Sequence, residues 1–431
     1  MNTRSWICLM VALFSSHPAF AGPSSIVKIQ NGLFERNGKP YVFVGANFWQ
    51  GMNLGSKGTG GDRPRLIREL DRLQNAGIKN LRIVALTEGP DTSPYRVTPS
   101  NQPSPGQFDE SLLEGLDFLL VEMGKRDLTA VVCLGNFWPW SGGFAQYVSW
   151  AEGSSIPYPP PHPGGSWSGF QEYSSRFYTL PKARALHAEA VKRIVSRVNT
   201  VSRIPYSKDP TILSWQLANE PRGGRYRTAF LDWMGSTAGL IKQLDPLHLV
   251  TTGSEGDTLN PVDAGNDFVQ DHSVKGIDYA TLHVWVENWG VYDPKQPVTL
   301  TKSMALMSQM IQSHTERAAR MKKPLVLEEF GLARDQRSMD PRSPTLSRDR
   351  YFAHTFAEVT RIRHLTGYLT GVAFWAWSGE SRPTVPGGLW KHGQPLLGDP
   401  PHEEQGWYGV YDTDQSTLSV IKKATHETRL K

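Results

Sequence analysis

The sequence predicts an α/β fold, a closed (β/α)8 TIM barrel with long loops at the C-terminal face of the strands, from three observations. Short apolar runs rich in β-branched residues alternate with amphipathic segments, a rhythm typical of parallel βα units. Eight such pairs follow one another along the chain. Several stretches after strands are long and rich in Gly, Pro and aromatic residues, whereas connections from helix to strand look short, which suits a barrel. The count alone also fits an open, doubly wound sheet.

The expected strands are near-continuous apolar runs, because a parallel strand in a barrel is covered on both faces. The eight runs are residues 41–47, 80–86, 128–134, 211–218, 249–253, 279–283, 325–330 and 371–377.

The expected helices carry apolar residues at helical spacing. In residues 64–76, Leu66, Leu70 and Leu73 share one stripe, and Gly77 follows as a stop signal. Only a poor helical candidate, around Phe268, lies between the fifth and sixth strands. The other helices are expected at residues 111–125, 181–201, 226–244, 300–321, 348–364 and 418–427.

The first 21 residues have the pattern of an export signal. Arg4 precedes an apolar stretch, and Ala19-Phe20-Ala21 is the small-x-small pattern that signal peptidase accepts. A single membrane anchor is the competing interpretation, but an apolar run of about ten residues is shorter than the roughly 20 that a membrane requires. We therefore expect a secreted or periplasmic protein cleaved after Ala21. Residues 22–431 should form one catalytic domain, because no Ser/Thr/Pro linker divides them.

Composition excludes several classes of partner. The formal charge of +5 is spread along the chain, whereas a nucleic-acid surface needs a basic stripe. Removal of the signal leaves Cys133 as the one remaining cysteine, so no internal disulfide can form. Neither His402-Glu403-Glu404 nor Asp412-Thr413-Asp414 has the spacing of a metal site. We expect a monomer that needs no metal or cofactor and that contacts no membrane after processing.

Two carboxylates stand at strand ends, where a barrel builds its active site. Glu220 follows the fourth strand and Glu329 ends the seventh, beside Glu328. Retaining hydrolysis of a glycosidic bond uses such a pair, one acid to protonate the leaving oxygen and one to attack the anomeric carbon. A structural ion pair or a helix cap is the competing interpretation for a single acid. Adjacent residues on a strand point to opposite faces, so we expect only one of Glu328 and Glu329 to enter the site.

Asn219-Glu220-Pro221 and Glu329-Phe330-Gly331 resemble the signatures of glycoside hydrolase family 5. The resemblance covers essentially the whole chain after the signal. It implies that Glu220 is the general acid/base, that Glu329 is the nucleophile, and that Asn219 donates a hydrogen bond to the 2-hydroxyl of the reacting sugar. The Glu-Phe-Gly match selects Glu329 over Glu328.

Further matches imply supporting roles. Arg82, in Leu81-Arg82-Ile83, corresponds to the arginine that braces the nucleophile, and His283 to a histidine near the acid/base. Trp375 matches the tryptophan that forms the floor of the sugar site. Trp377 has the same strand parity, so it is either a second platform or part of the core.

Within the family, the chain resembles the β-mannanase branch. The matching segments are Gly45-Ala46-Asn47-Phe48-Trp49-Gln50-Gly51, Gln146-Tyr147-Val148-Ser149-Trp150, His283-Val284-Trp285 and Asp399-Pro400-Pro401-His402-Glu403. We therefore expect Trp49 near the substrate. Two positions depart from the general family pattern. Leu134-Gly135-Asn136 lacks the histidine that many members carry after the third strand, as in mannanases, and Trp285 replaces a tyrosine whose hydroxyl commonly bonds the nucleophile. An indole N–H donates one bond and accepts none, so the way the nucleophile is held is open.

The loop of residues 137–178 is rich in aromatic residues, and pyranose faces stack well on flat rings. We expect part of this set, Trp138 first, to line an extended cleft. The alternative is a loop that folds over its own aromatic rings. The members of the set are Trp138, Trp140, Tyr147, Trp150, Tyr158 and Trp167.

The resemblance implies a retaining endo-acting hydrolase of internal β-1,4-mannosidic bonds in mannan, glucomannan or galactomannan. A β-1,4-glucanase and an exo-acting β-mannosidase are alternatives within enzymes. A non-catalytic glycan-binding barrel is the alternative of another class, since a fold does not fix a function. The presence of both acids and Arg82 favours catalysis.

Overall fold

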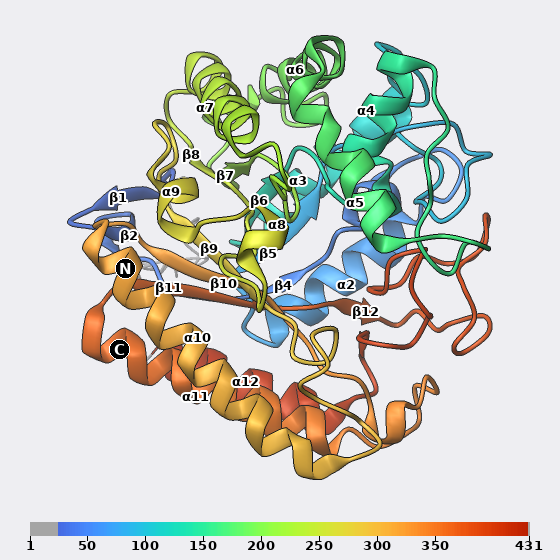
Figure 1. The fold of residues 1–431 in the computed structure, drawn as a ribbon. Coiled ribbons are helices and arrows are strands. Elements are labelled where there is room, and N and C mark those ends of the chain that lie inside the picture. Colours follow the sequence, from blue (N-terminus) through green and yellow to red (C-terminus); the bar gives the residue numbers. More distant parts are fainter. Residues whose placement is uncertain (1–24, 430–431) are drawn as a thin grey trace, which may run out of the picture.

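The computed structural model describes residues 25–429, in which eight parallel strands form a closed barrel (Figure 1). Neighbouring strands follow the order β8-β7-β6-β5-β4-β11-β10-β9, and a parallel bridge between Thr251 and Tyr279 closes the ring. The predicted barrel is therefore confirmed. Its strands are Phe43–Asn47 (β4), Asn80–Val84 (β5), Thr129–Cys133 (β6), Ile212–Gln216 (β7), Leu249–Thr251 (β8), Ala280–Val284 (β9), Leu325–Phe330 (β10) and Leu369–Phe374 (β11).

Every residue of these eight strands is buried, as expected for a sheet that is filled inside and covered outside. The expected and observed strands differ by a few residues at their ends. The eighth strand is the important case: it ends at Phe374 and does not run on to Trp377, which belongs to a separate pair formed by β12 (Trp377–Gly379) and β13 (Val410–Tyr411).

Helices surround the barrel, with α10, α11 and α12 along one side and α6 and α7 along another in Figure 1. Helix α2 begins after Asp62, whose carboxylate accepts a hydrogen bond from the backbone N–H of Arg65 at 2.9 Å. The longer helices are Arg63–Asn75 (α2), Glu110–Gly124 (α3), Gly143–Glu152 (α4), Trp167–Ser175 (α5), Pro181–Val195 (α6), Arg227–Leu244 (α7), Leu300–Arg320 (α10), Leu346–Thr366 (α11) and Gln415–Arg429 (α12). The short ones are Gly51–Gly55 (α1), Pro261–Ala264 (α8) and Phe268–Ser273 (α9).

The expectation that one helix would span residues 181–201 was wrong, because α6 ends at Val195. The chain then turns around the buried carboxylate of Asp117. That carboxylate accepts hydrogen bonds from Arg197 at 2.8 Å and from the backbone N–H of Thr200 at 3.0 Å. These bonds replace the helical ones.

Three short antiparallel strands that the sequence reading missed cover the N-terminal end of the barrel. They are Lys28–Gln30 (β1), Leu33–Arg36 (β2) and Lys39–Pro40 (β3), at the left of Figure 1. Phe34 packs edge-on against Tyr279 at 5.2 Å between ring centroids, so this end of the barrel is closed by side chains.

The long loops gather at the opposite end, at the right of Figure 1, together with α4 and α5. The predicted export signal, residues 1–21, lies outside the described residues. Among residues 25–429, no helix combines the length and apolar character needed to cross a membrane.

Candidate active site

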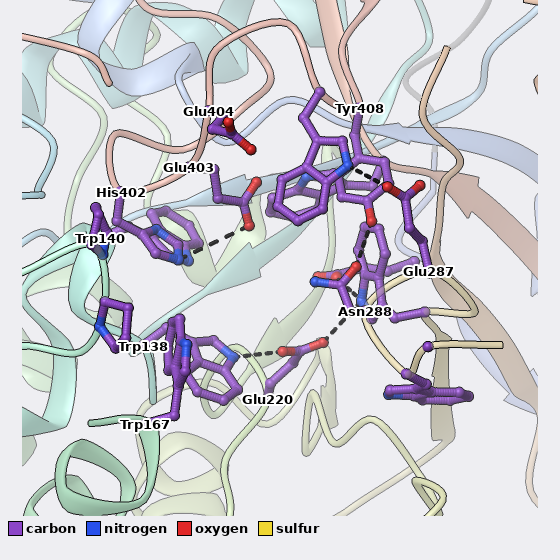
Figure 2. A pocket seen from close by; sticks show the side chains of 18 of the residues that line it. Trp138, Trp140, Trp167, Glu220, Glu287, Asn288, His402, Glu403, Glu404 and Tyr408 are labelled. Atoms are coloured by element: carbon purple, nitrogen blue, oxygen red, sulfur yellow. Dashed lines mark hydrogen bonds and ion pairs between the residues drawn. The ribbon is translucent and has the colours of Figure 1, made fainter. Parts of the chain in front are cut away.

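A cavity of about 1190 Å³ opens at the C-terminal ends of the strands (Figure 2). Its size exceeds the usual range for sites of small drug-like ligands and suits an oligosaccharide. Aromatic and charged side chains share its wall. They include Trp138, Trp140, Trp167, Asn219, Glu220, Arg222, Glu255, Trp285, Glu287, Asn288, Glu329, Trp375, His402, Glu403, Trp407 and Tyr408.

Glu220 reaches this cavity from the loop that follows β7. Its backbone is left-handed, with φ of 49°, and its N–H donates to the carbonyl of Gly253 at 2.9 Å. Gly253 permits this approach, because a Cβ there would lie 1.9 Å from the carbonyl oxygen of Ala218. A non-glycine residue in the left-handed region is uncommon and often marks a functional site.

Glu329 lies near the end of β10, beside a break in the strand register. Leu327 pairs with Leu282, and Glu329 pairs with His283, so Glu328 is an extra residue in the ladder. The expectation that Glu328 and Glu329 would point to opposite faces was wrong, because this bulge interrupts the alternation. The Glu328 carboxylate lies inside the barrel, where it accepts a hydrogen bond from Gln216 at 2.6 Å.

Glu220 and Glu329 converge. One carboxylate oxygen of each and a ring nitrogen of His283 lie within 4.8 Å of one another. Nδ1 of His283 is 2.7 Å from Oε1 of Glu220 and 3.4 Å from Oε2 of Glu329. The indole N–H of Trp138 donates to Oε2 of Glu220 at 2.5 Å, a contact drawn in Figure 2.

Arg82 binds the second oxygen of Glu329 and orients the residues around it. Its guanidinium contacts Glu329 directly and donates to Oδ1 of Asn219 at 2.7 Å and to Oε1 of Gln216 at 2.9 Å. Asn219 in turn donates to Asn136 at 3.1 Å. Arg82 therefore fixes both the nucleophile candidate and the amide beside Glu220.

The three central groups have strongly shifted pKa values. Burial raises the pKa of Glu329 to about 7, against the opposing charges of His283 and Arg82. Burial also acts to raise the pKa of Glu220, but the hydrogen bond and charge of His283 lower it to about 2. Burial opposes a charged imidazole, yet the carboxylates of Glu329, Glu220 and Glu328 raise the pKa of His283 to about 10. Groups that share protons in this way are typical of active sites.

Glu220, His283 and Glu329 have the donor atoms and the spacing that a metal ion would need. Two features disfavour a cation: the imidazole is protonated at neutral pH, and Arg82 already neutralises Glu329. That the chain needs no metal stays a prediction.

Comparison with known proteins identifies the family. A family model described as "GH family 5 beta-mannosidase-like" matches residues 24–431. The chain belongs to glycoside hydrolase family 5. Mannan endo-1,4-beta-mannosidase 1 of Solanum lycopersicum is 31% identical over 86% of this chain and 88% of its own length. Mannan endo-1,4-beta-mannosidase 3 of Arabidopsis thaliana is 31% identical over 87% of this chain and 88% of its own length.

A solved family 5 mannosidase from Rhizomucor miehei is 40% identical, with a TM-score of 0.87 over 94% of this chain and 98% of that chain. A mutant of that mannosidase has been solved in complex with mannosyl-fructose. The endo-1,4-beta-mannanase from the same organism is 21% identical and shares the fold, with a TM-score of 0.69 over 94% of this chain and all of that chain.

The structure places only some of the candidate tryptophans of this family 5 chain at the cavity. Trp375 and Trp285 line it, and their rings meet edge-on at 6.1 Å. Trp377 does not: its indole donates to the buried carboxylate of Glu69 at 2.9 Å, away from the cavity. Because β11 ends at Phe374, Trp375 and Trp377 no longer share a strand face, so Trp377 belongs to the core. Trp49 does not line the cavity: its indole donates to the carbonyl of Gly398 at 2.7 Å, and its ring packs against Trp140, which does line it, at 5.5 Å.

Some aromatic residues of the segment 137–178 line the cavity, and others pack away from it. Trp138, Trp140 and Trp167 line the cavity. Tyr147 packs edge-on against Trp150 at 5.4 Å, so these two fold over their own loop. The hydroxyl of Tyr158 accepts a bond from Arg96, which lies in the long segment after β5, so Tyr158 joins two loops.

Several cavity residues were given no site role from the sequence, although Glu403 lies in one of the matching segments. Arg222 forms two bonds to Glu255, of 2.6 and 2.9 Å, and lies over the ring of Trp138 at 4.8 Å. Glu403 reaches the cavity from the segment after β12, and its Oε2 has no hydrogen-bond partner among the described residues. Arg222 directly follows the Asn-Glu-Pro motif, which is the one signal that could have found it.

Proposed function

We propose that this chain hydrolyses β-1,4-mannosidic bonds of β-mannans with retention, using Glu329 as nucleophile and Glu220 as acid/base. The observation that best supports this proposal is that a carboxylate oxygen of Glu220 and one of Glu329 lie within 4.8 Å of each other in one cavity. Retaining enzymes hold their carboxyl groups about 5 to 5.5 Å apart, whereas inverting enzymes need roughly 6.5 to 9.5 Å to admit a water. Membership in a glycoside hydrolase family favours catalysis over a non-catalytic barrel.

The first step needs one proton on the carboxylate pair. Below about pH 7 the cluster of Glu220, Glu329 and His283 holds two protons, one on His283 and one on a carboxylate. Positive charge that develops at the anomeric carbon favours ionised Glu329, which Arg82 also stabilises, and leaves the proton to Glu220. Glu329 then attacks the anomeric carbon while Glu220 protonates the leaving oxygen.

The second step returns the site to its starting state. Glu220, now ionised, removes a proton from water, whose oxygen attacks the anomeric carbon and releases Glu329. Asn219 has one amide hydrogen left after its bond to Asn136, and we assign it to the 2-hydroxyl of the reacting sugar. Trp375 supplies the ring beneath that sugar.

Endo action on internal bonds of mannan, glucomannan or galactomannan is supported by the names of the curated relatives, each about 31% identical. We further propose that the chain is exported, on the basis of its first 21 residues. A β-1,4-glucanase has no such support among these relatives.

Exo action on short β-mannosides is the second candidate, and one contact favours it. The ring of Trp167 meets that of His402 edge-on at 6.1 Å, so loops from opposite sides of the cavity touch beside Trp138 (Figure 2). A contact of this kind closes one end of the cavity and leaves room for fewer sugar units, as exo action requires. The 40% identical structure is also named a mannosidase.

One set of assays tests these proposals. Purified protein is incubated with mannan, glucomannan and cellulose, and then with reducing-end-labelled mannohexaose. Proton NMR of the first product should show the β-anomer, and an initial α-anomer would contradict retention. Internal products from mannohexaose support endo action, whereas release of mannose alone supports exo action. Hydrolysis of cellulose but not of mannan would contradict the proposed substrate.

A further inference from the structure

Trp285 directs one N–H into the gap between the two catalytic carboxylates. The indole nitrogen lies 3.3 Å from Oε1 of Glu220 and 3.2 Å from Oε2 of Glu329. An indole has a single hydrogen to donate and no acceptor. The two contacts are therefore made by the same hydrogen, which both carboxylates share.

The ring that carries this hydrogen is held from several sides. Tyr408 packs against it at 4.9 Å between ring centroids, and the Tyr408 hydroxyl donates to Asn288 at 2.5 Å. Trp375 meets it edge-on at 6.1 Å. Gly331 leaves room for it, since a Cβ there would lie 3.2 Å from the indole. The donor thus keeps its place while the chemistry proceeds beside it.

We propose that Trp285 is a positioning residue whose N–H bonds whichever of Glu329 and Glu220 is ionised, and so serves both half-reactions. The proposal rests on the proposed function. Before bond cleavage the negative charge is on Glu329, and the N–H donates to its Oε2. Cleavage forms an ester between Glu329 and the anomeric carbon, and the proton of Glu220 leaves with the departing oxygen. The charge is then on Glu220, whose Oε1 lies at nearly the same distance from the indole.

Attack of water reverses the transfer. Glu220 takes a proton from the water, the ester bond breaks, and the charge returns to Glu329. A tyrosine hydroxyl at this position would rotate about its C–O bond and turn its one hydrogen toward one carboxylate at a time, whereas the hydrogen of an indole is fixed in the plane of the ring. The fixed bridge of Trp285 therefore differs from the Tyr–nucleophile bond that this family commonly uses.

Trp285→Phe tests the proposal, because it keeps an aromatic ring and removes the N–H. Both half-reactions should slow by about 10- to 100-fold, the effect of losing one hydrogen bond to a charged group. Pre-steady-state kinetics with 2,4-dinitrophenyl β-mannoside separate the steps, since its leaving group needs no proton and its burst reports formation of the ester. Trp150→Phe is the matched control: it makes the same change outside the cavity lining and should behave as the unsubstituted chain.

The pH profile separates this role from simple packing. Loss of a donor to an ionised carboxylate raises the pKa of that carboxylate, so both limbs of the kcat/KM profile should move up by roughly one to two pH units. The other charged or titratable groups that face the pair stay unchanged in the variant: Arg82, His283, Arg222, Glu255, Glu328 and Glu403. A packing defect would lower the rate without moving the limbs.

Two further variants keep the test decisive if Trp285→Phe does not fold. Benzothienylalanine at position 285 keeps the shape of the ring and replaces the N–H by sulfur, so it should reproduce both the slower steps and the shifted limbs. Trp285→Tyr should restore formation of the ester more than its hydrolysis and give a larger burst. Rates and limbs that match the unsubstituted chain would overturn the proposal.

The failure of this inference is distinguishable from failure of the proposed function. The unsubstituted chain should become covalently labelled at Glu329 by 2-deoxy-2-fluoro-β-mannosyl fluoride, as detected by mass spectrometry. Absence of label and of β-mannoside turnover would overturn the proposed function and this inference with it. Normal labelling with no effect of the Trp285 substitutions would overturn the inference alone.

Discussion

The indole N–H of Trp138 donates to Oε2 of Glu220 at 2.5 Å, so a ring expected to stack on sugar also holds the carboxylate that we propose as acid/base. Trp138→Phe keeps the aromatic face and removes this bond. We expect kcat to fall by about 10-fold, because a hydrogen bond to a charged group contributes roughly 1.5–3 kcal/mol. Steady-state kinetics on mannotetraose measure the effect.

Trp167→Phe is the control for that experiment. Trp167 lines the cavity and packs edge-on against Trp138 at 5.7 Å, but no hydrogen bond joins its indole to either catalytic carboxylate. Its substitution should alter KM and leave kcat near that of the unsubstituted chain. Equal losses of kcat in the two variants would show that the Trp138–Glu220 bond has no separate role.

The shared protons of the active site predict an alkaline limit to activity. The productive state needs protonated Glu220, ionised Glu329 and charged His283, which is two protons on the three groups. As pH rises through about 7, the raised pKa of Glu329, the two carboxylates lose the one proton that they share. They gain another proton only at about pH 2, the lowered pKa of Glu220. We expect kcat/KM to fall as pH rises through about 7. A profile that stays flat to about pH 9 would contradict this proton count.

The fold could be predicted from the sequence because buried parallel strands have nearly continuous apolar sequences. The stretch of residues 325–330 coincides with β10, and the helices around it were found within a few residues. The three N-terminal strands were missed, since β1 to β3 have only two to four residues each and are mostly polar. The end of α6 was missed because a carboxylate distant in sequence, Asp117, sets it.

Short motifs led to the two carboxylates that converge in the cavity, Glu220 and Glu329, but not to their surroundings. A rule of alternating faces fails at Glu328, where a bulge adds a residue that only the partner strand reveals. The same rule grouped Trp377 with Trp375, although β11 ends at Phe374, before both residues, and Trp377 begins the separate strand β12. The neighbours of Trp285 come from segments far apart in sequence, so no local pattern could place its N–H between two carboxylates.

Glu403 is a buried carboxyl group, and we expect its ionisation to lower the stability of the folded chain as pH rises. Burial, together with the charges of Asp399, Glu329 and Glu220, raises the pKa of Glu403 well above its ordinary value of 4.5. The folded chain therefore keeps a proton at Glu403 that the unfolded chain loses above about pH 4.5, and stability contributed by this group falls as pH rises. Glu403→Gln should melt near the temperature of the unsubstituted chain at about pH 4 and a few degrees higher at about pH 8.

The control for Glu403 is its neighbour. Glu404 is paired with Arg337 at 2.7 Å at the cavity rim, so Glu404→Gln should change the melting temperature little at either pH. Scanning calorimetry at both pH values compares the variants. A higher melting temperature for Glu403→Gln at acidic pH alone would reverse the predicted sign.

Trp375 and Trp377 provide a paired test of which ring belongs to the site. Trp375→Phe shrinks a ring that lines the cavity and that we propose lies beneath the reacting sugar, so we expect kcat/KM to fall by about 10-fold or more with little change in melting temperature. Trp377→Phe removes the 2.9 Å bond to buried Glu69, which should cost about 1–3 kcal/mol of stability and leave kcat/KM within about twofold. Urea unfolding and kinetics on the same preparations separate the two effects. If Trp377→Phe lost as much kcat/KM as Trp375→Phe while remaining stable, Trp377 would have to reach the substrate, against the position of its ring.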